Sequence, residues 1–185
     1  NNFVIGACTP SPLWSITSLF SKFYFEKYNI ITKIENNSEL IAGLKNDNYQ
    51  MIILSKPYNE HDIQSVEYEK EELFLSVPQN HKLAKKKGIY FSDIEDDKML
   101  LFNPIGIWRD IVFKKMPNMN FLIQSDGIIF KELAKTQKLL SFSSNLVINR
   151  EGTTFKNNIL IPILDKEAKM LYYLVFKKGI KRKIE

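Results

Sequence analysis

Short apolar runs alternate with amphipathic stretches along the whole chain, and this alternation limits the fold more than any other feature. In the first half, apolar runs predict buried strands at 3–8, 30–35 and 49–55. Helical patterns separate these runs, one from about Pro12 to Tyr28 and one that Ser38 can cap. The β-α-β-α-β order predicts a parallel sheet with helices on its faces.

The second half repeats the alternation without repeating the sequence. The stretch at 66–78 is expected to form two strand segments. The later apolar runs that predict strands lie at 98–103, 120–125, 138–143, 158–164 and 169–178. Helices are expected at 105–116 and at 126–135, and Asp126 can cap the second of them. Two α/β lobes with a ligand cleft between them are therefore the predicted architecture.

Polar side chains recur where the predicted strands end. Several of these positions also open a helix, where free backbone N–H groups can receive an anion such as a carboxylate. One such residue is usually only a helix cap, but recurrence after successive strands predicts a site for a small ligand. The candidate ligand-binding residues are Thr9, Ser11, Ser55, Asn103, Gln124, Ser125 and Ser143. Trp108 and Phe142 are candidates for apolar walls, with core packing as the alternative.

The helix at 12–28 carries more apolar surface than one sheet covers. Its main stripe consists of Leu13, Ile16, Phe20, Phe23 and Tyr24. Trp14, Phe25 and Tyr28 widen the stripe on one flank, so that the apolar arc is roughly twice the ~100° that a helix on a sheet requires. A second copy of the chain is expected to cover this flank, and burial within the monomer is the alternative. Ser11 is the expected N-cap of this helix.

The sequence contains no pattern that predicts catalysis, a cofactor or a metal site. It has neither a P-loop nor a dinucleotide-binding glycine motif. His61 and His81 lack partners at metal-ligand spacing, and Cys8 is expected to be a core thiol. The carboxylates at 71–72 and 95–97 are interpreted as solvated. We therefore do not predict an enzyme.

The charge and hydropathy of the chain also limit its partners. The net charge is +5, with dense lysine runs at 84–88 and 176–185 that lack the interleaved aromatics of a nucleic-acid platform. No apolar run approaches the ~20 residues of a membrane-spanning helix. With one cysteine and no visible signal peptide, we expect a cytoplasmic protein without a membrane partner.

Between 71 and 102 the chain resembles the effector-binding domain of LysR-type transcriptional regulators. That family carries E-x-L-x-L-V-x-P-x-x-H-P-L-A, followed by an I-x-x-x-D-L turn. The matching residues are Glu71 or Glu72, Leu73, Leu75, Val77, Pro78, His81, Leu83, Ala84, Ile89, Asp93 and Ile94. The opening IGACTPSPLW and the late YLVFKK resemble the family's first strand and a late strand. His81 is expected to satisfy local backbone in a turn.

The chain also departs from the family pattern. Lys82 stands where the family usually has proline, and Asp47 and Gln50 replace a common glycine and aspartate. The segment at 138–143 replaces a G-I-A-x-L-P-like strand. These departures concern details of the cleft rather than the fold.

The resemblance implies a type 2 periplasmic-binding-protein-like fold of two Rossmann-like lobes. Lobe I would comprise 1–75 with 176–185 returning to it, and lobe II would comprise 76–175. It further implies a small-molecule effector, with anions among the candidates, and a homodimer that forms a tetramer in the full-length protein. DNA would be bound only through an N-terminal winged helix-turn-helix domain that this chain lacks.

Two other functions remain open from the sequence. A stand-alone solute-binding protein of a transporter would share the fold and the cleft. A small α/β enzyme would need a base and a nucleophile in contact at the strand ends, and no such pair can be named.

Overall fold

The computed structural model describes residues 1–24, 26–152 and 157–180, and for Tyr24 it describes the backbone alone. The chain divides into two compact units, the first made of residues 1–70 and the segment from Leu171 onward, the second of residues 71–170. The chain leaves the first unit within strand β4 (Ile63–Pro78) and returns to it within strand β9 (Lys169–Lys177). The expected lobe bounds, 1–75 and 76–175, stay a prediction.

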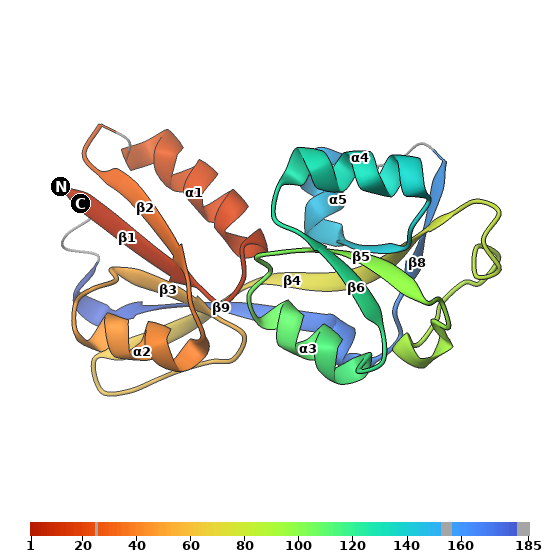
Figure 1. Ribbon diagram of the computed structural model, residues 1–185. Helices are drawn as coiled ribbons and strands as arrows, with labels where there is room; N and C mark the ends of the chain where they lie inside the picture. Colours follow the sequence, from red (N-terminus) through yellow and green to blue (C-terminus); the bar gives the residue numbers. More distant parts are fainter. Residues whose placement is uncertain (25, 153–156, 181–185) are drawn as a thin grey trace. The chain divides into compact units, whose positions relative to one another are not determined.

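The first unit is built on a sheet of short strands. Its strands follow the order β2 (Asn29–Ile34), β1 (Asn2–Ala7), β3 (Met51–Leu54) and β9, with the first three parallel and β9 antiparallel to β3. Helices α1 (Ser11–Tyr24) and α2 (Asn37–Lys45) cover opposite faces of this sheet (Figure 1). Right-handed crossovers explain the arrangement, because the chain moves one way from β1 to β2 and the other way from β2 to β3.

Tyr49 holds α2 against the sheet of the first unit. A Cβ on Gly6 would meet a carbon of its ring at 2.9 Å, and a Cβ on Gly43 would meet one at 2.4 Å. The Tyr49 hydroxyl donates to the Glu35 carboxylate at 2.6 Å. Burial, together with this negatively charged acceptor, raises the pKa of Tyr49 above its ordinary value. The two positions therefore need glycine, because the Tyr49 ring approaches both of them closely and the Leu40 side chain would meet a Cβ on Gly6 at 2.4 Å.

Helix α1 buries one apolar stripe and exposes another. Leu13, Ile16 and Phe20 are each less than a tenth exposed, and the Phe20 ring packs on an aromatic ring of β1. Leu19 is 49% exposed and Phe23 is 62% exposed. The prediction of an apolar arc wider than the sheet needs is confirmed, although Phe23 lies in its exposed part rather than in the sheet-facing stripe.

The ends of α1 differ from the prediction. The helix ends at Tyr24 rather than at Tyr28, because β2 has to begin at Asn29 to pair in register with β1. Ser11 is already the first helical residue and is therefore not the N-cap. The carbonyl of Pro10 accepts the backbone N–H of Leu13, in the first turn of the helix, at 3.0 Å.

Two further local predictions are wrong. The N-cap of α2 is Asn36, whose side chain accepts the N–H of Glu39 at 2.9 Å, while the Ser38 hydroxyl donates to Asn36. The stretch at 66–78 lies within one continuous strand, β4, rather than in two segments. The sequence allows either Asn36 or Ser38 as the cap, and either one strand or two at 66–78. Contacts with neighbouring elements select one of the two in each case.

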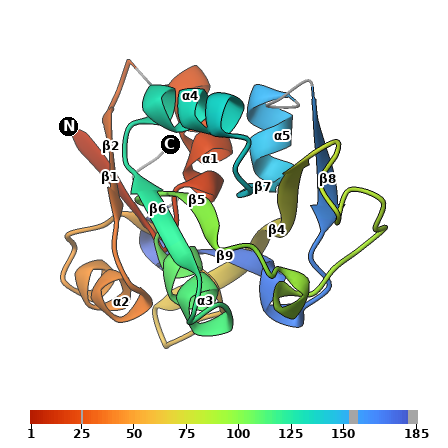
Figure 2. The ribbon, with the colours of Figure 1, turned by 45° about the vertical axis from the view of Figure 1, so that its right-hand side comes forward.

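The second unit places a mixed sheet between helices. Strand β4 lies between β7 (Ser141–Ser144) and β8 (Asn158–Pro162), which both run antiparallel to it. Strand β5 (Lys98–Phe102) pairs in parallel with β6 (Asn120–Gln124), and a parallel bridge from Met99 to Leu140 joins β5 to the start of β7. Figures 1 and 2 show α3 (Ile107–Lys115) on one face and α4 (Gly127–Gln137) with α5 (Asn145–Glu151) on the other. The predicted α/β class is confirmed, and Asp126 caps α4 as expected.

Asp165 connects three segments of the second unit. One carboxylate oxygen lies 2.9 Å from the ammonium of Lys115 in the last turn of α3, and the other accepts the N–H of Phe91 at 2.8 Å. Phe91 begins the short 3-10 helix Phe91–Asp93, and a second one, Lys166–Ala168, follows Asp165. Burial acts to raise the pKa of Asp165, but the Lys115 ammonium and the Phe91 N–H outweigh it and hold the pKa below its ordinary value.

The contact between Tyr49 and α2 makes a prediction about stability. Replacing Gly43 by alanine forces a methyl group into the Tyr49 ring and should lower the free energy of unfolding by about 1–3 kcal/mol, despite the better helix propensity of alanine. Gly127, which has no atom within 4 Å of a Cβ position, is the matched helical control. Gly127→Ala should leave stability unchanged or raise it by up to about 1 kcal/mol. Urea unfolding measures both, and equal effects of the two variants would contradict the packing argument.

Candidate functional site

The carboxyl ends of the strands in the first unit bring polar side chains to one edge. Backbone hydrogen bonds continue the sheet past the end of β1. The N–H of Cys8 donates to the carbonyl of Ile53, and the N–H of Glu35 donates to the carbonyl of Ala7, both at 3.1 Å. Thr9 and Ser55, which follow β1 and β3, therefore lie at the same edge, as predicted from the strand order. Thr9 is fully buried and Ser55 is half-buried.

Asn37 is a member of this edge that sequence reasoning missed. Its amide nitrogen donates to the Ser55 hydroxyl at 3.1 Å, and its amide oxygen is buried without a hydrogen-bond partner. Asn37 is the first residue of α2, directly after the N-cap. An asparagine at a helix start is so common a capping signal that a role toward a ligand could not be separated from it in the sequence.

The second unit gathers the other candidates at its own carboxyl edge. Phe102 lies opposite Gln124 in the parallel register, and the N–H of Asn103 donates to the Gln124 carbonyl at 2.9 Å. Because β7 runs parallel to β5 through the Met99 bridge, Ser143 reaches the same edge. Ser125 follows Gln124 and is exposed.

Strand alternation sorts these residues between the two faces of the sheet. The ring of Phe102 packs edge-on against Phe130 of α4 at 5.6 Å, so Gln124 and Ser143, which share its parity, point to the α4 face. Asn103 points to the other face, where its side-chain oxygen accepts a hydrogen bond from Arg109 of α3 at 3.3 Å.

Among the residues that the structure describes, the hydroxyl of Ser143 has no hydrogen-bond partner. The residue is 7% exposed, and its oxygen is buried without a hydrogen bond. Buried hydroxyls nearly always find a partner, because leaving one unpaired costs free energy. The Ser143 hydroxyl is therefore a polar group at this edge whose hydrogen bonding the described residues leave incomplete.

A buried carboxylate network lies beside this edge, and the sequence interpretation of Glu71 as solvated is wrong. Glu71 is 1% exposed. Its two oxygens accept hydrogen bonds from the Trp108 indole nitrogen at 2.5 Å and from the Ser144 hydroxyl at 2.8 Å. Ser144 is also the N-cap of α5, since its oxygen accepts the N–H of Val147 at 3.2 Å. The network joins β4, α3 and α5 within the second unit.

Of the two candidate wall residues, Trp108 packs in the core of the second unit, as the alternative interpretation stated, and Phe142 is half-buried. Trp108 is 4% exposed and donates to Glu71. Phe142 packs edge-on against Phe91 at 6.0 Å. The Trp108–Glu71 pair could have been anticipated in part, because a buried indole N–H needs an acceptor. The identity of an acceptor 37 positions away is not readable from the sequence.

The expected dimer-interface residues differ in their surroundings. Trp14 lies in α1 and is half-buried. Tyr28 lies beyond the end of α1 and packs edge-on against Phe3 of its own chain at 5.9 Å. Phe25 lies outside the described residues. The expectation of a dimer through this surface stays a prediction.

Among the residues that the structure describes, no group of three or more histidine, cysteine, aspartate or glutamate side chains could hold a metal ion. Within the same part of the chain, no helix combines the length and apolar character needed to cross a membrane.

Neighbouring serines in β7 provide a test of these assignments. Ser144→Ala removes both a donor to buried Glu71 and the cap of α5, and should lower the free energy of unfolding by about 1–3 kcal/mol. Ser143→Ala removes a hydroxyl that has no partner and should change stability by no more than about 0.5 kcal/mol, or raise it. Urea unfolding of the two variants decides between them, and a larger loss for Ser143→Ala would contradict the structure.

Comparisons with known proteins show which sequences this chain resembles. No protein-family model matches the chain. It is 24% identical over 147 residues to the transcriptional dual regulator GltC of Bacillus subtilis (strain 168). The aligned region covers 76% of this chain and 48% of GltC. It is 27% identical over 114 residues to the uncharacterized HTH-type transcriptional regulator YybE of the same organism, covering 57% of this chain and 39% of YybE. The chain thus spans less than half the length of these curated relatives.

Solved structures share the fold over nearly the whole chain. The reduced OxyR regulatory domain from Pseudomonas aeruginosa matches with a TM-score of 0.71 at 15% identity, over 99% of this chain and 93% of that one. The BenM effector binding domain with its effector benzoate matches with a TM-score of 0.64 at 16% identity, over 99% and 90%. The regulatory domain of Synechocystis PCC6803 CcmR in complex with 2-PG matches with a TM-score of 0.65 at 16% identity, over 96% and 88%.

These likenesses establish the fold, which is the type 2 periplasmic-binding-protein-like fold of LysR effector-binding domains. The chain is thus similar in sequence to two bacterial transcriptional regulators and shares its fold with LysR effector-binding domains.

Proposed function

We propose that this chain is the ligand-sensing and dimerising part of a bacterial LysR-type transcription regulator. A small effector binds at the carboxyl strand edges and stabilises the conformation for which it has the higher affinity. DNA contact belongs to a domain outside this chain, and the whole protein acts in the cytoplasm as a dimer or tetramer. The similarity to GltC and YybE, both transcriptional regulators, favours this function over that of a stand-alone transport protein.

The observation that carries the ligand site is the unpaired hydroxyl of Ser143 among the polar groups of one edge. Gln124 shares its face of the sheet, and Asn103 and Ser125 follow the adjacent strands. In the first unit, Thr9, Ser11 and Ser55 supply hydroxyls at the corresponding edge, and the amide oxygen of Asn37 is unpaired there. The groups of each edge suit a small molecule rich in hydrogen-bonding atoms, with carboxylates as the first class to examine.

Benzoate and 2-PG indicate which small molecules to test first. Each accompanies a protein of this fold in a solved structure, benzoate as the effector of BenM and 2-PG in complex with CcmR. Benzoate is an aromatic carboxylate, so small carboxylates and phosphorylated acids are the natural starting panel. Neutral sugars and amino acids complete the panel, because hydroxyls and amides also bind these compounds.

The ligand site is tested by thermal-shift screening of that panel, followed by calorimetry with the strongest hit. Ser143→Ala should weaken the affinity for that hit by about tenfold, corresponding to the loss of one hydrogen bond of about 1.4 kcal/mol. Thr136→Ala removes a hydroxyl that binds only within α4 and should leave the affinity unchanged. If Ser143→Ala and Thr136→Ala bind the hit equally well, the proposed site is wrong.

The exposed apolar stripe of α1 supports the dimer. Leu19 and Phe23 expose about half or more of their surface on one helix, which is costly in water and typical of an interface. A second copy of the chain is the partner that the sequence resemblance implies. Trp14 is half-buried and lies about 180° around the helix axis from Phe23, so it belongs to the opposite flank of α1, where the sequence places the expected interface residues.

Sedimentation at micromolar concentration tests the dimer. Phe23→Glu should raise the dimer dissociation constant by more than about tenfold, because a charge would be buried in the interface. Val66, an apolar residue that is 50% exposed on β4, provides a matched control through Val66→Glu. A wild-type chain that sediments as a monomer, or an equal effect of both variants, would contradict the assignment of α1 to the interface.

A further inference from the structure

A short apolar ridge lies on the surface of the second unit, where residues 88–90 run beside residues 162–164. Ile89 forms a parallel bridge with Ile163, and both side chains are buried. Two backbone hydrogen bonds, at 3.0 and 2.7 Å, join the segments at this bridge. Because side chains alternate along extended backbone, the residues on either side of the buried pair point outward.

The outward residues of the ridge are apolar. Tyr90 is 51% exposed, Leu164 is 48% exposed, and Pro162 is also exposed. A Cβ on Gly88 would lie 2.9 Å from the Leu164 side chain, so the leucine lies against the backbone of this glycine. Leu164 is thus placed by a packing contact and still leaves about half of its surface in water.

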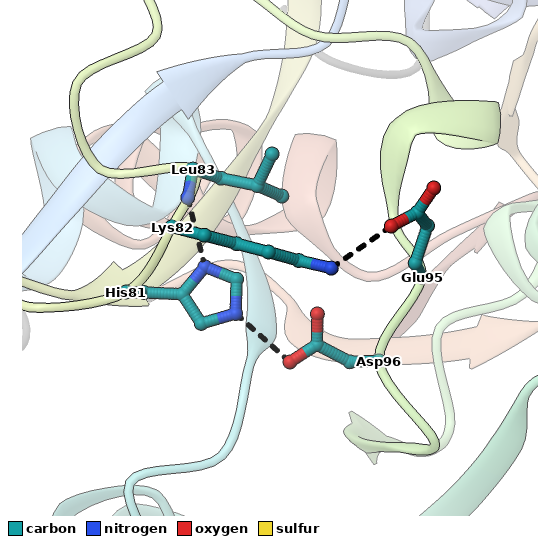
Figure 3. A network of polar contacts seen from close by, with 5 residues as sticks. All are labelled: His81, Lys82, Leu83, Glu95 and Asp96. Carbon is teal, nitrogen blue, oxygen red and sulfur yellow. Dashed lines mark hydrogen bonds and ion pairs between the residues drawn. The ribbon is translucent and has the colours of Figure 1, made fainter.

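A network of polar contacts fixes the loop that leads into this ridge (Figure 3). Nδ1 of His81 accepts the N–H of Leu83 at 3.2 Å, and Nε2 lies 2.8 Å from a carboxylate oxygen of Asp96. The expectation that His81 satisfies local backbone in a turn is confirmed. The ammonium of Lys82 pairs with the carboxylate of Glu95 at 3.0 Å, and this hydrogen bond raises the pKa of Lys82 above its ordinary value. Two acidic side chains of the loop are therefore already engaged.

Three consecutive lysines follow this network and end beside the ridge. The lysines at 85–87 are exposed, and the last of them directly precedes Gly88. Among the residues that the structure describes, none of the three forms an ion pair. The carboxylate of Asp93 accepts the N–H of Tyr90 at 2.7 Å, and Asp165 pairs with the lysine at the end of α3. Positive charge without an internal ion pair therefore borders the apolar ridge.

We propose that the ridge and the lysines at 85–87 form a docking surface for an acidic protein segment that carries a bulky apolar side chain. The carboxylates of the segment pair with the lysines, and its apolar side chain packs on Tyr90 and Leu164. Nucleic acid is the other polyanion that lysines attract. It offers no aliphatic side chain for Leu164, and the lysine run contains no arginine, the residue best suited to phosphate. The proposal does not depend on the proposed effector or dimer.

The test measures amide chemical shifts of the folded chain in about 0.1 M salt, where exposed charges more than ~10 Å apart are largely screened. The probe is the hexapeptide Asp-Asp-Leu-Phe-Asp-Asp with blocked ends. We expect saturable shifts at 85–90 and 162–164 with a dissociation constant of about 0.1–1 mM.

Three control ligands separate the contributions of charge and apolar contact. Asn-Asn-Leu-Phe-Asn-Asn lacks the charges, and Asp-Asp-Gly-Ser-Asp-Asp lacks the apolar side chains. Each should bind at least about fivefold more weakly than the probe. Hexathymidylate, a single-stranded nucleic acid, should bind no more tightly than the second of these peptides.

The charge contact is tested by a triple variant with Lys85→Gln, Lys86→Gln and Lys87→Gln. This variant should bind the probe at least about tenfold more weakly. A matched control removes the same charge from exposed lysines elsewhere in the same unit, through Lys98→Gln, Lys114→Gln and Lys135→Gln. The control should change the affinity by less than about twofold.

The apolar contact is tested by Leu164→Ala, which should weaken binding of the probe about three- to tenfold through the loss of packing area. Ile129 of α4 is 50% exposed in the same unit, so Ile129→Ala is the matched control and should leave the affinity unchanged. Thermal unfolding checks that each variant is folded, and the lysine variant is an independent readout if Leu164→Ala is not.

Each possible outcome decides the proposal. Absence of a saturable shift with the probe at about 5 mM overturns it. Equal effects of the two triple variants, or of Leu164→Ala and Ile129→Ala, also overturn it. Tighter binding of hexathymidylate than of the probe would assign the surface to nucleic acid. A dimer dissociation constant that rises in the lysine variant would assign it to a second copy of the chain, and both of these results overturn the proposal.

Discussion

Parallel strand pairing is the constraint on which the rest of the structure depends. Parallel neighbours require a helical crossover, so the loops after successive strands collect at one edge and the loops before them at the other. In the second unit this rule brings Asn103, Gln124 and Ser143 to one edge. It also sends the charged loop around Asp96 to the opposite edge. Two chemically different surfaces thus follow from one pairing rule.

Buried polar contacts then fix the elements around this frame. Glu71 accepts from an indole on α3 and from the serine that caps α5, so one carboxylate orients both helices relative to β4. Asp165 does the same for α3 and the loop before β9. Such groups cost free energy unless they are fully paired, which makes them specific for one arrangement. Against this background, the buried hydroxyl of Ser143 is an exception, because it has no hydrogen-bond partner among the described residues.

Most of the fold could be read from local pattern. Apolar runs and helical periodicity predict the order of strands and helices, and Asp126 marks the start of α4 by ordinary capping chemistry. Errors arose where two local solutions are nearly equal in energy. Asn36 and Ser38 can both cap α2, and the end of α1 depends on where β2 must begin to pair with β1. Pairing partners distant in sequence make these choices.

The sequence by itself determined the α/β class, the family likeness and the set of polar residues at the strand ends, because these follow from local periodicity and ordered motifs. Only the tertiary structure decided which polar groups are paired. Glu71, interpreted as solvated, is buried between Trp108 and Ser144, whereas the hydroxyl of Ser143 next to it has no partner. The physical reason is that burial and hydrogen bonding depend on residues brought together from far apart in the chain, which no local pattern records.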